Sequence, residues 1–191
     1  MEKFINQESE QKLNFLSEKL KFSLRISKEA VNFLPEISED DIKTKKEKFR
    51  FLLGSFNVIN QEEFEVSIKG VFEDEEEIIY KEGKEEIYDI SMPRAVNFVQ
   101  GINKMPEFKD WKLIGEVHTH PCKPSEFKEN FIPWMPSEGD CNALIENYKK
   151  GILKDNQPYI FGIAAPNESG ETLYAYYRII KDKDAYSYIK I

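Results

Sequence analysis

Histidine and cysteine are scarce in this chain: its 191 residues contain two of each, and the cysteines are Cys122 and Cys141. Two cysteines are too few for the disulfide framework that holds small secreted proteins together. No apolar run approaches the roughly 20 residues that a helix needs to span a bilayer. The first residues, MEKFINQESEQ, lack the apolar stretch of a secretory signal peptide. We therefore predict a cytoplasmic protein that does not span a membrane.

A basic surface is also missing. The formal charge at pH 7 is -8, whereas binding to nucleic-acid phosphates needs a stripe of lysine and arginine. The lysine-rich piece at residues 43–50 is short. The acidic run at residues 73–77 predicts a solvated turn or, as the alternative, a partner surface. We therefore expect no nucleic-acid partner and consider a protein with a basic face more plausible.

The length and the hydrophobic content of 40% suit one compact domain with a short appendage. Apolar residues recur with helical spacing in some segments and alternate in others, which predicts an α/β protein. The predicted helices cover residues 8–20, 28–34, 94–104 and 137–150, and the predicted strands cover residues 21–26, 51–58, 64–72, 111–120, 159–164 and 172–180. We predict a helical extension at residues 1–20 and a single domain at residues 21–191.

The two histidines, His118 and His120, end the apolar run LIGEVHTHP. In a strand the side-chain period of two places both imidazoles on one face. Asp140, in the sequence Pro-Ser-Glu-Gly-Asp downstream, can supply a third ligand. Two neutral imidazoles and one carboxylate can hold Zn²⁺ in about a tetrahedron and leave the fourth position open, as in catalytic zinc sites. The pattern therefore predicts a zinc site.

Three motifs in this order resemble a known family. Residues 47–54 read Glu-Lys-Phe-Arg-Phe-Leu-Leu-Gly, residues 118–121 read His-Thr-His-Pro, and residues 137–140 read Ser-Glu-Gly-Asp. They resemble the JAMM signature of the JAB/MPN metalloproteases, in particular bacterial-type JAB domains and deubiquitinase-like isopeptidases. The order of predicted elements is similar to the JAB core over roughly residues 20–180. The resemblance implies an α/β (α+β) fold, related to the cytidine-deaminase fold, with a central mixed sheet flanked by helices.

The resemblance also implies roles for individual residues. His118, His120 and Asp140 would bind zinc, and a zinc-bound water would attack the carbonyl carbon of the substrate. Glu47 would hold that water and act as general acid and base, because a nearby carboxylate can carry its proton to the leaving amine. Ser137 would stabilise the oxyanion that appears in the tetrahedral intermediate.

The chain departs from the family pattern in two places. The family leaves about ten residues between the second histidine and the aspartate, whereas here residues 121–139 intervene, which predicts an insertion at about residues 122–135. A second Pro-Ser pair, at residues 124–125, lies inside the insertion, but Lys128 stands where the aspartate should be and cannot ligate zinc. Arg50 occupies a place near the glutamate where glycine is common in the family.

Several of these residues have competing interpretations. Glu116 shares a strand face with the histidines and competes with Glu47; the resemblance favours Glu47 as proton carrier and leaves Glu116 as a group supporting the ligands or a surface charge. Ser137 with Asp140 also fits a helix-capping box, which is compatible with ligation because a helix start fixes the carboxylate. Cys122 is a possible fourth ligand, but a free thiol is the preferred interpretation.

The insertion contains several apolar residues close in sequence to the expected metal ligands. Phe131 and Trp134 are its main aromatic residues, and loops seldom carry such side chains without burying them. We hypothesise that they bind substrate, as a clamp over an extended C-terminal tail. A small satellite core is the equally weighted alternative.

Three classes of function follow. The leading hypothesis is a zinc-dependent isopeptidase or peptidase that cleaves after the C-terminal tail of a ubiquitin-like protein, in deconjugation or precursor processing, with that protein or its conjugate and proteins of an activating or conjugating pathway as partners. The alternatives are another zinc hydrolase and a non-catalytic MPN-type scaffold. A nucleobase deaminase is disfavoured, because its Pro-Cys-x-x-Cys segment is missing.

Overall fold

The computed structural model describes residues 21–59, 63–73, 88–126, 133–153, 157–182 and 185–190. The expected N-terminal helix at residues 8–20 lies outside these ranges. Most of the acidic run and the middle of the insertion, with Phe131 and Lys128, also lie outside them.

Seven strands of the described chain form one mixed sheet in the order β1-β3-β2-β4-β5-β6-β7. They are β1 (Lys21–Ile26), β2 (Phe49–Val58), β3 (Glu63–Phe72), β4 (Lys112–Thr119), β5 (Ile160–Pro166), β6 (Thr172–Asp182) and β7 (Ala185–Lys190). The pairs β1 with β3 and β4 with β5 are parallel. The other neighbours are antiparallel. The mixed α/β architecture expected from the sequence is thus confirmed.

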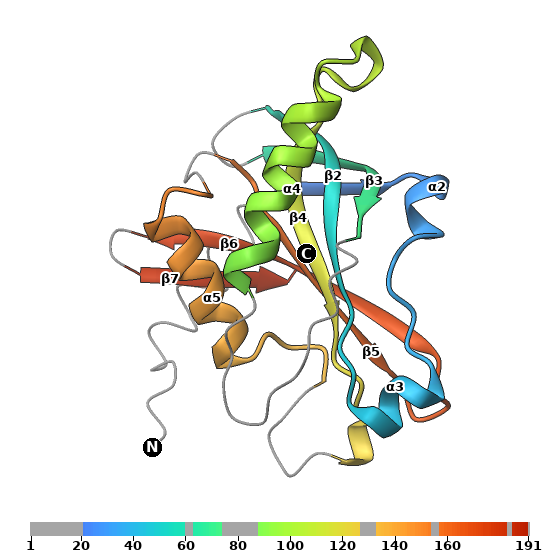
Figure 1. Cartoon of the computed structure of the whole chain (residues 1–191). Helices are drawn as coiled ribbons and strands as arrows, with labels where there is room; N and C mark the ends of the chain where they lie inside the picture. Colours follow the sequence, from blue (N-terminus) through green and yellow to red (C-terminus); the bar gives the residue numbers. More distant parts are fainter. Residues whose placement is uncertain are drawn as a thin grey trace.

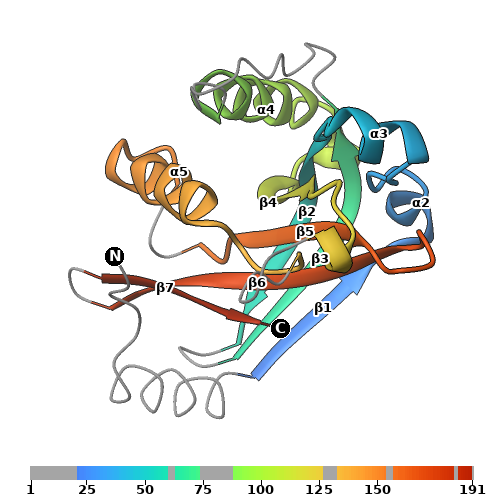
Figure 2. The same ribbon diagram turned by 90° about the horizontal axis from the view of Figure 1, so that it is seen from below.

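Four α-helices accompany the described part of this sheet: α2 (Lys28–Val31), α3 (Glu39–Thr44), α4 (Tyr88–Ile102) and α5 (Glu138–Lys149). Two short 3₁₀ turns, η1 (Pro106–Phe108) and η2 (Pro124–Glu126), lie on either side of β4 in the sequence. Figures 1 and 2 show α4 and α5 together on one face of the sheet. No helix in the described ranges is long and apolar enough to cross a membrane.

Each face of the sheet has its own hydrophobic core. The first core lies under α4 and α5, and its buried members are Phe51, Met92, Ala95, Leu144, Leu153, Tyr159, Phe161, Ile163, Ala175 and Tyr177. The second core contains Ala30 and Leu34 of the α2 region together with residues from β2 to β5. Arg178 of β6 lies over the ring of Phe64 in β3, 3.9 Å from its centroid, although three strands separate β3 from β6. The sheet therefore curls around the second core.

Strand β4 is the central element and carries the histidines. Its pairing with β2 shifts register between Leu52 and Leu53, next to Ile114. Beyond this bulge Glu116 and His118 share the face of α4 and α5, and both are buried. Gly115 lets β5 approach closely, because a Cβ atom at this position would lie 2.3 Å from the carbonyl oxygen of Ile160. The glycine of GEVHTHP thus serves strand packing.

The sequence predicted most elements but misplaced some boundaries. The predicted helix at residues 94–104 begins earlier, at Tyr88, and contains Pro93 in its interior; the preference of proline for the first helical turn had suggested the later start. Its buried residues include Met92, Ala95 and Val99, and the partly exposed Phe98 stacks on Phe72 of β3 with the ring centroids 4.6 Å apart. The apolar pattern of residues 42–51 predicts a helical or mixed segment, and in the structure these residues divide into the end of α3 and the start of β2. Strand β7 was not predicted.

Candidate metal centre

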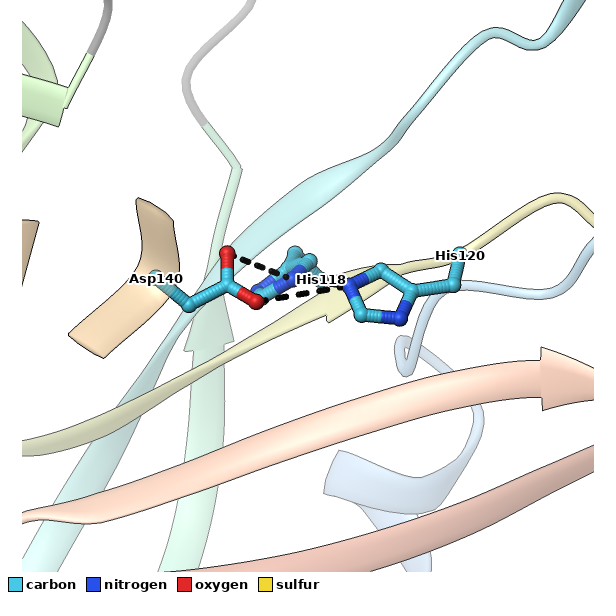
Figure 3. A group of neighbouring side chains, drawn as sticks. All are labelled: His118, His120 and Asp140. Atoms are coloured by element: carbon cyan, nitrogen blue, oxygen red, sulfur yellow. Dashed lines mark hydrogen bonds and ion pairs between the residues drawn. The ribbon is translucent and has the colours of Figure 1, made fainter. Parts of the chain in front are cut away.

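His118 and His120 lie at the end of β4 with their imidazoles pointing toward Asp140 (Figure 3). His118 is the penultimate residue of the strand and His120 follows it. All three side chains are buried. The Nε2 atoms of the two histidines are 3.0 Å apart. Alternation along β4 thus brings both rings to one point, as expected for a His-x-His strand.

Asp140 reaches the histidines from the first turn of α5. The Ser137 hydroxyl accepts a hydrogen bond from the Asp140 amide at 3.1 Å, and the Ser137 amide donates to Asp140 Oδ2 at 2.7 Å. This reciprocal pair is a capping box, which satisfies two otherwise orphaned amides at the helix start. It also fixes the carboxylate, whose Oδ1 and Oδ2 lie 3.4 Å from His118 Nε2 and 3.5 Å from His120 Nε2, respectively.

The spacing of these donor atoms suits a metal ion. One ligand atom from each of His118, His120 and Asp140 lies within 4.8 Å of the others. A tetrahedron with bonds of about 2 Å has edges of about 3.3 Å. The two Nε2 atoms are 3.0 Å apart, Asp140 Oδ1 lies 3.4 Å from His118 Nε2, and Asp140 Oδ2 lies 3.5 Å from His120 Nε2. The buried group can therefore bind a metal ion, with two nitrogen donors and one oxygen donor.

A hydrogen bond from the far end of the insertion orients His120. Its Nδ1 lies 2.8 Å from the carbonyl oxygen of Pro133. A carbonyl can only accept, so Nδ1 carries the proton and Nε2 presents its lone pair toward Asp140 and His118. Metal-binding histidines commonly donate their second ring nitrogen to such an acceptor. Pro133 thus holds the ring in the tautomer that ligation requires.

The charges in the group favour a bound cation. Burial would raise the pKa of the Asp140 carboxyl, but His118 and His120 hold that pKa well below its usual range. Burial would also lower the pKa of His120, but Asp140, the Pro133 carbonyl and the charge of Glu47 raise it above its usual value. Asp140 is therefore an ionised carboxylate at neutral pH, which is the form that ligates metals.

Glu47 lies just before β2, opposite His120. Phe49 pairs with His118 in the antiparallel ladder, and the Thr119 amide donates to the Lys48 carbonyl at 2.9 Å, so the next position places Glu47 across from His120. Opposite residues of antiparallel strands project to the same face. The Glu47 side chain is half-buried, and its charge acts on His120. The structure thus brings Glu47 to the histidine pair.

Glu116 lies further back on the same face of β4 and is 1% exposed. The Tyr159 hydroxyl donates to its Oε2 at 2.6 Å, while its Oε1 has no hydrogen-bond partner. Burial raises the pKa of Glu116 to about 8, against the lowering effect of Tyr159. One of its carboxyl oxygens is thus taken up by Tyr159, and Glu116 lies two residues before His118, farther from the end of β4. Its position fits a group that supports the ligands.

Of the two residues predicted to bind substrate, Trp134 lies in the described part of the chain. Trp134 packs against the first core, and its Nε1 donates to the Ala165 carbonyl at 3.4 Å. Its own carbonyl accepts a hydrogen bond from the Tyr177 hydroxyl at 2.5 Å. Trp134 therefore packs on the first core itself, whereas Phe131 of the hypothesised clamp lies outside the described residues.

Neither cysteine belongs to the donor group. Both are free thiols and half-buried. Burial raises the pKa of Cys122 despite the nearby Lys45 ammonium, and burial, with Asp140 and Glu138, raises that of Cys141 to about 11. Arg50, which stands where glycine is common in the family, does not belong to the donor group. It forms an ion pair with Glu73, the residue after β3.

Sequence reasoning missed three contributors to the site: the Pro133 carbonyl, the Tyr159 hydroxyl and the pairing of Lys48 with Thr119. The first two contacts join residues that are 13 and 43 positions apart in the sequence. The periodicity of helices and strands does not predict contacts between residues so far apart. The third follows from strand register: once β2 and β4 are aligned on Phe49 and His118, Lys48 must lie opposite Thr119.

Comparisons with known proteins show no family for the chain. No family model matches it, and no curated protein matches it. Among solved structures it is similar to the solution structure of protein DSY2949 from Desulfitobacterium hafniense, with 13% identity and a TM-score of 0.44 over 88% of this chain and 90% of that chain. A likeness at this level carries no argument about function.

Proposed function

We propose that this protein is a zinc-dependent isopeptidase or peptidase of the JAB/MPN type, which cleaves after the C-terminal tail of a ubiquitin-like protein. The observation that carries the proposal is the buried group of His118, His120 and Asp140 with Glu47 opposite His120. Along the chain, Glu47 comes first, followed by His118, His120 and Asp140, which is the order of the JAMM pattern. The mixed sheet with α4 and α5 on the histidine face is compatible with a JAB core.

Zinc fits the donor set, because two imidazoles and a carboxylate with a fourth position left open form a catalytic zinc site. When bound, it lowers the pKa of a coordinated water to about 7 and polarises a carbonyl group. His118, His120 and Asp140 would hold the ion, with the capping box at Ser137 fixing the carboxylate.

Glu47 would accept a proton as the peptide bond is attacked and return it to the leaving amine. Its half-buried position opposite His120 suits this task, since a general base must lie within hydrogen-bond reach of the proton that it takes. Because Glu116 accepts a hydrogen bond from Tyr159 and lies farther from the end of β4 than the histidines, we assign the transfer to Glu47 and not to Glu116.

Ser137 would assist at the oxyanion. Its hydroxyl oxygen already accepts from the Asp140 amide, which leaves the hydroxyl hydrogen available as a donor. A donor aimed at charge that develops only during the reaction lowers the barrier selectively. Capping the helix and stabilising the intermediate are thus compatible tasks for one side chain.

Two other functions share parts of this evidence. Another zinc hydrolase would use the same ligands with a different substrate, so substrate tests separate it from the isopeptidase. A non-catalytic MPN-type scaffold has no need for Glu47 beside a complete ligand set, which disfavours it. The assignment of a ubiquitin-like substrate rests on the family resemblance, and a gene for such a protein or its activating enzyme beside this one would support it.

The deciding experiment measures metal content and cleavage together. The purified protein is expected to contain about one zinc per chain and to release aminomethylcoumarin from the C terminus of ubiquitin. Treatment with 1,10-phenanthroline should abolish cleavage, and added Zn²⁺ should restore it. His120→Ala is the matched inactive control. A protein that takes up no metal would refute the proposal, whereas metal uptake without cleavage of ubiquitin or of ubiquitin-like fusions would favour the scaffold or a different hydrolase.

A further inference from the structure

Lys48, the residue after Glu47, is held by both its backbone and its side chain. Its amide donates to Thr119 Oγ1 at 2.7 Å, and its carbonyl accepts from the Thr119 amide at 2.9 Å. Its ammonium donates to Asp41 Oδ2 at 2.7 Å and to the Glu36 carbonyl at 2.8 Å. Four bonds to three different segments therefore fix this one residue.

The Asp41 carboxylate that binds Lys48 is itself held by hydrogen bonds. Asp41 is buried and belongs to the capping box of α3, in which Ser38 donates to Asp41 Oδ2 from its amide at 2.7 Å and from its hydroxyl at 2.6 Å. Burial would raise the pKa of Asp41, but the bonds from Lys48 and Ser38 lower it below the usual value. The carboxylate is thus ionised, and its Oδ2 accepts the bonds from both Ser38 and the Lys48 ammonium.

The second anchor lies inside the metal motif. Thr119 is the residue between His118 and His120, and it is fully buried. Because Lys48 exchanges bonds with Thr119, the positions of the two adjacent residues, Glu47 and His120, are set relative to each other. A movement of Lys48 along β2 would carry Glu47 with it.

Such a linkage matters because proton transfer is sensitive to distance. A displacement of about 1 Å in a reacting group can cost about 100-fold in rate. Glu47 lies two residues before β2, and the ladder between β2 and β4 ends at the pair of Phe49 and His118. The bonds of Lys48 to Thr119 extend this pairing by one residue, and its side chain adds a restraint to Asp41 and Glu36.

We infer that Lys48, anchored by Asp41 and Thr119, is a positioning residue that holds Glu47 against the metal centre. The inference rests on the proposed function and deepens it. An alternative is that the pair of Lys48 and Asp41 only stabilises α3. The two accounts differ in one respect: positioning acts through Glu47 and disappears when Glu47 is inactive, whereas a stabilising contact acts regardless of Glu47.

The test compares Lys48→Met with Lys48→Arg, Asp41→Asn and the matched control Lys43→Met, an exposed lysine of α3. Lys48→Met is expected to lower kcat for ubiquitin aminomethylcoumarin by about ten- to a hundredfold with little change in KM. Lys48→Arg should recover most of this loss, because guanidinium also pairs with carboxylate. Asp41→Asn should fall between them, since the amide oxygen keeps the capping bond. Lys43→Met should equal the wild type.

Two further measurements separate positioning from stability. Zinc affinity, measured by competition with a chromophoric chelator, should be the same in Lys48→Met and in the wild type; a large loss of affinity would overturn the inference. In a Glu47→Gln background, under single-turnover conditions, Lys48→Met should cause no further loss of rate. The same ten- to a hundredfold loss in that background would also overturn it.

The outcomes distinguish this inference from the function on which it rests. If the wild type cleaves the probe while Lys48→Met and Lys43→Met are equally active, the positioning role is refuted and the protease assignment stands. If the wild type binds zinc but cleaves no ubiquitin-like probe, the assignment fails and the positioning role fails with it. If Lys48→Met does not fold, Asp41→Asn and the Lys48→Arg comparison carry the same test.

Discussion

The Nδ1 atom of His120 donates to the carbonyl oxygen of Pro133 at 2.8 Å. Pro133 stands at the end of the predicted insertion, next to Trp134, which packs on the first core. The insertion is therefore tied to the metal centre at its C-terminal end, and the segment that departs from the family spacing also orients a predicted ligand.

Removal of the Trp134 side chain should weaken the connection between the insertion and His120. Trp134→Ala is expected to lower the free energy of unfolding by about 3 kcal/mol and to weaken zinc binding by about tenfold, because Pro133 would hold His120 less firmly. Urea denaturation and chelator competition measure the two effects. Tyr177→Phe, which removes the hydrogen bond to the Trp134 carbonyl, should cost about 1 kcal/mol. If Trp134→Ala instead raised KM alone, with stability unchanged, the clamp hypothesis would be favoured.

Glutamine exchanges should separate the two candidate proton carriers. Glu47→Gln is expected to lower kcat/KM by a factor of about 100 or more, while zinc content stays near one per chain. Glu116→Gln should lose less than about tenfold, because Glu116 sits behind the ligands and binds Tyr159. Steady-state kinetics with metal analysis of both variants checks this. Equal losses in the two variants would contradict the assignment of Glu47.

Metal removal should destabilise the protein through Asp140. An ion present at 100 times its Kd adds about 2.7 kcal/mol to the free energy of unfolding, so the wild type should show a higher Tm with zinc than with chelator. Asp140→Asn should abolish most of that difference. Asp41→Asn is the matched control, since Asp41 occupies the same place in the capping box of α3 but lies outside the metal group. A zinc-dependent Tm that survives in Asp140→Asn would exclude Asp140 as a ligand.

The lowered pKa of Asp41 predicts a pH dependence with a definite sign. In the folded protein the carboxyl titrates below its unfolded value, mainly because Lys48 and Ser38 outweigh the effect of burial. Its contribution is therefore present above about pH 4 and is lost as the pH falls through the folded value. The stability difference between wild type and Asp41→Asn should be largest near pH 6 and shrink toward pH 3. Urea unfolding of chelator-treated protein at several pH values measures it, with the exposed Asp40 changed to Asn as control.

The elements and the ligand set follow from local patterns in the sequence. Alternation in residues 111–120 placed His118 and His120 on one face, and the Ser-x-x-Asp sequence placed Asp140 at a helix start. The start of α4 was mispredicted, because the preference of proline for the first helical turn placed it at residue 94, whereas the helix begins at Tyr88 and contains Pro93. Glu47 came from the resemblance alone, since its approach to His120 depends on the register between β2 and β4, which sequence spacing does not encode.

The same four-residue capping box begins both α3 and α5, with Ser38 and Asp41 in one and Ser137 and Asp140 in the other. In the first the aspartate meets an ammonium group, and in the second it meets two imidazoles. The same capping box can therefore hold a buried carboxylate at a helix start next to different partners. The residues that face the carboxylate, a lysine in one case and two histidines in the other, would then decide whether it pairs with an ammonium group or binds a metal ion.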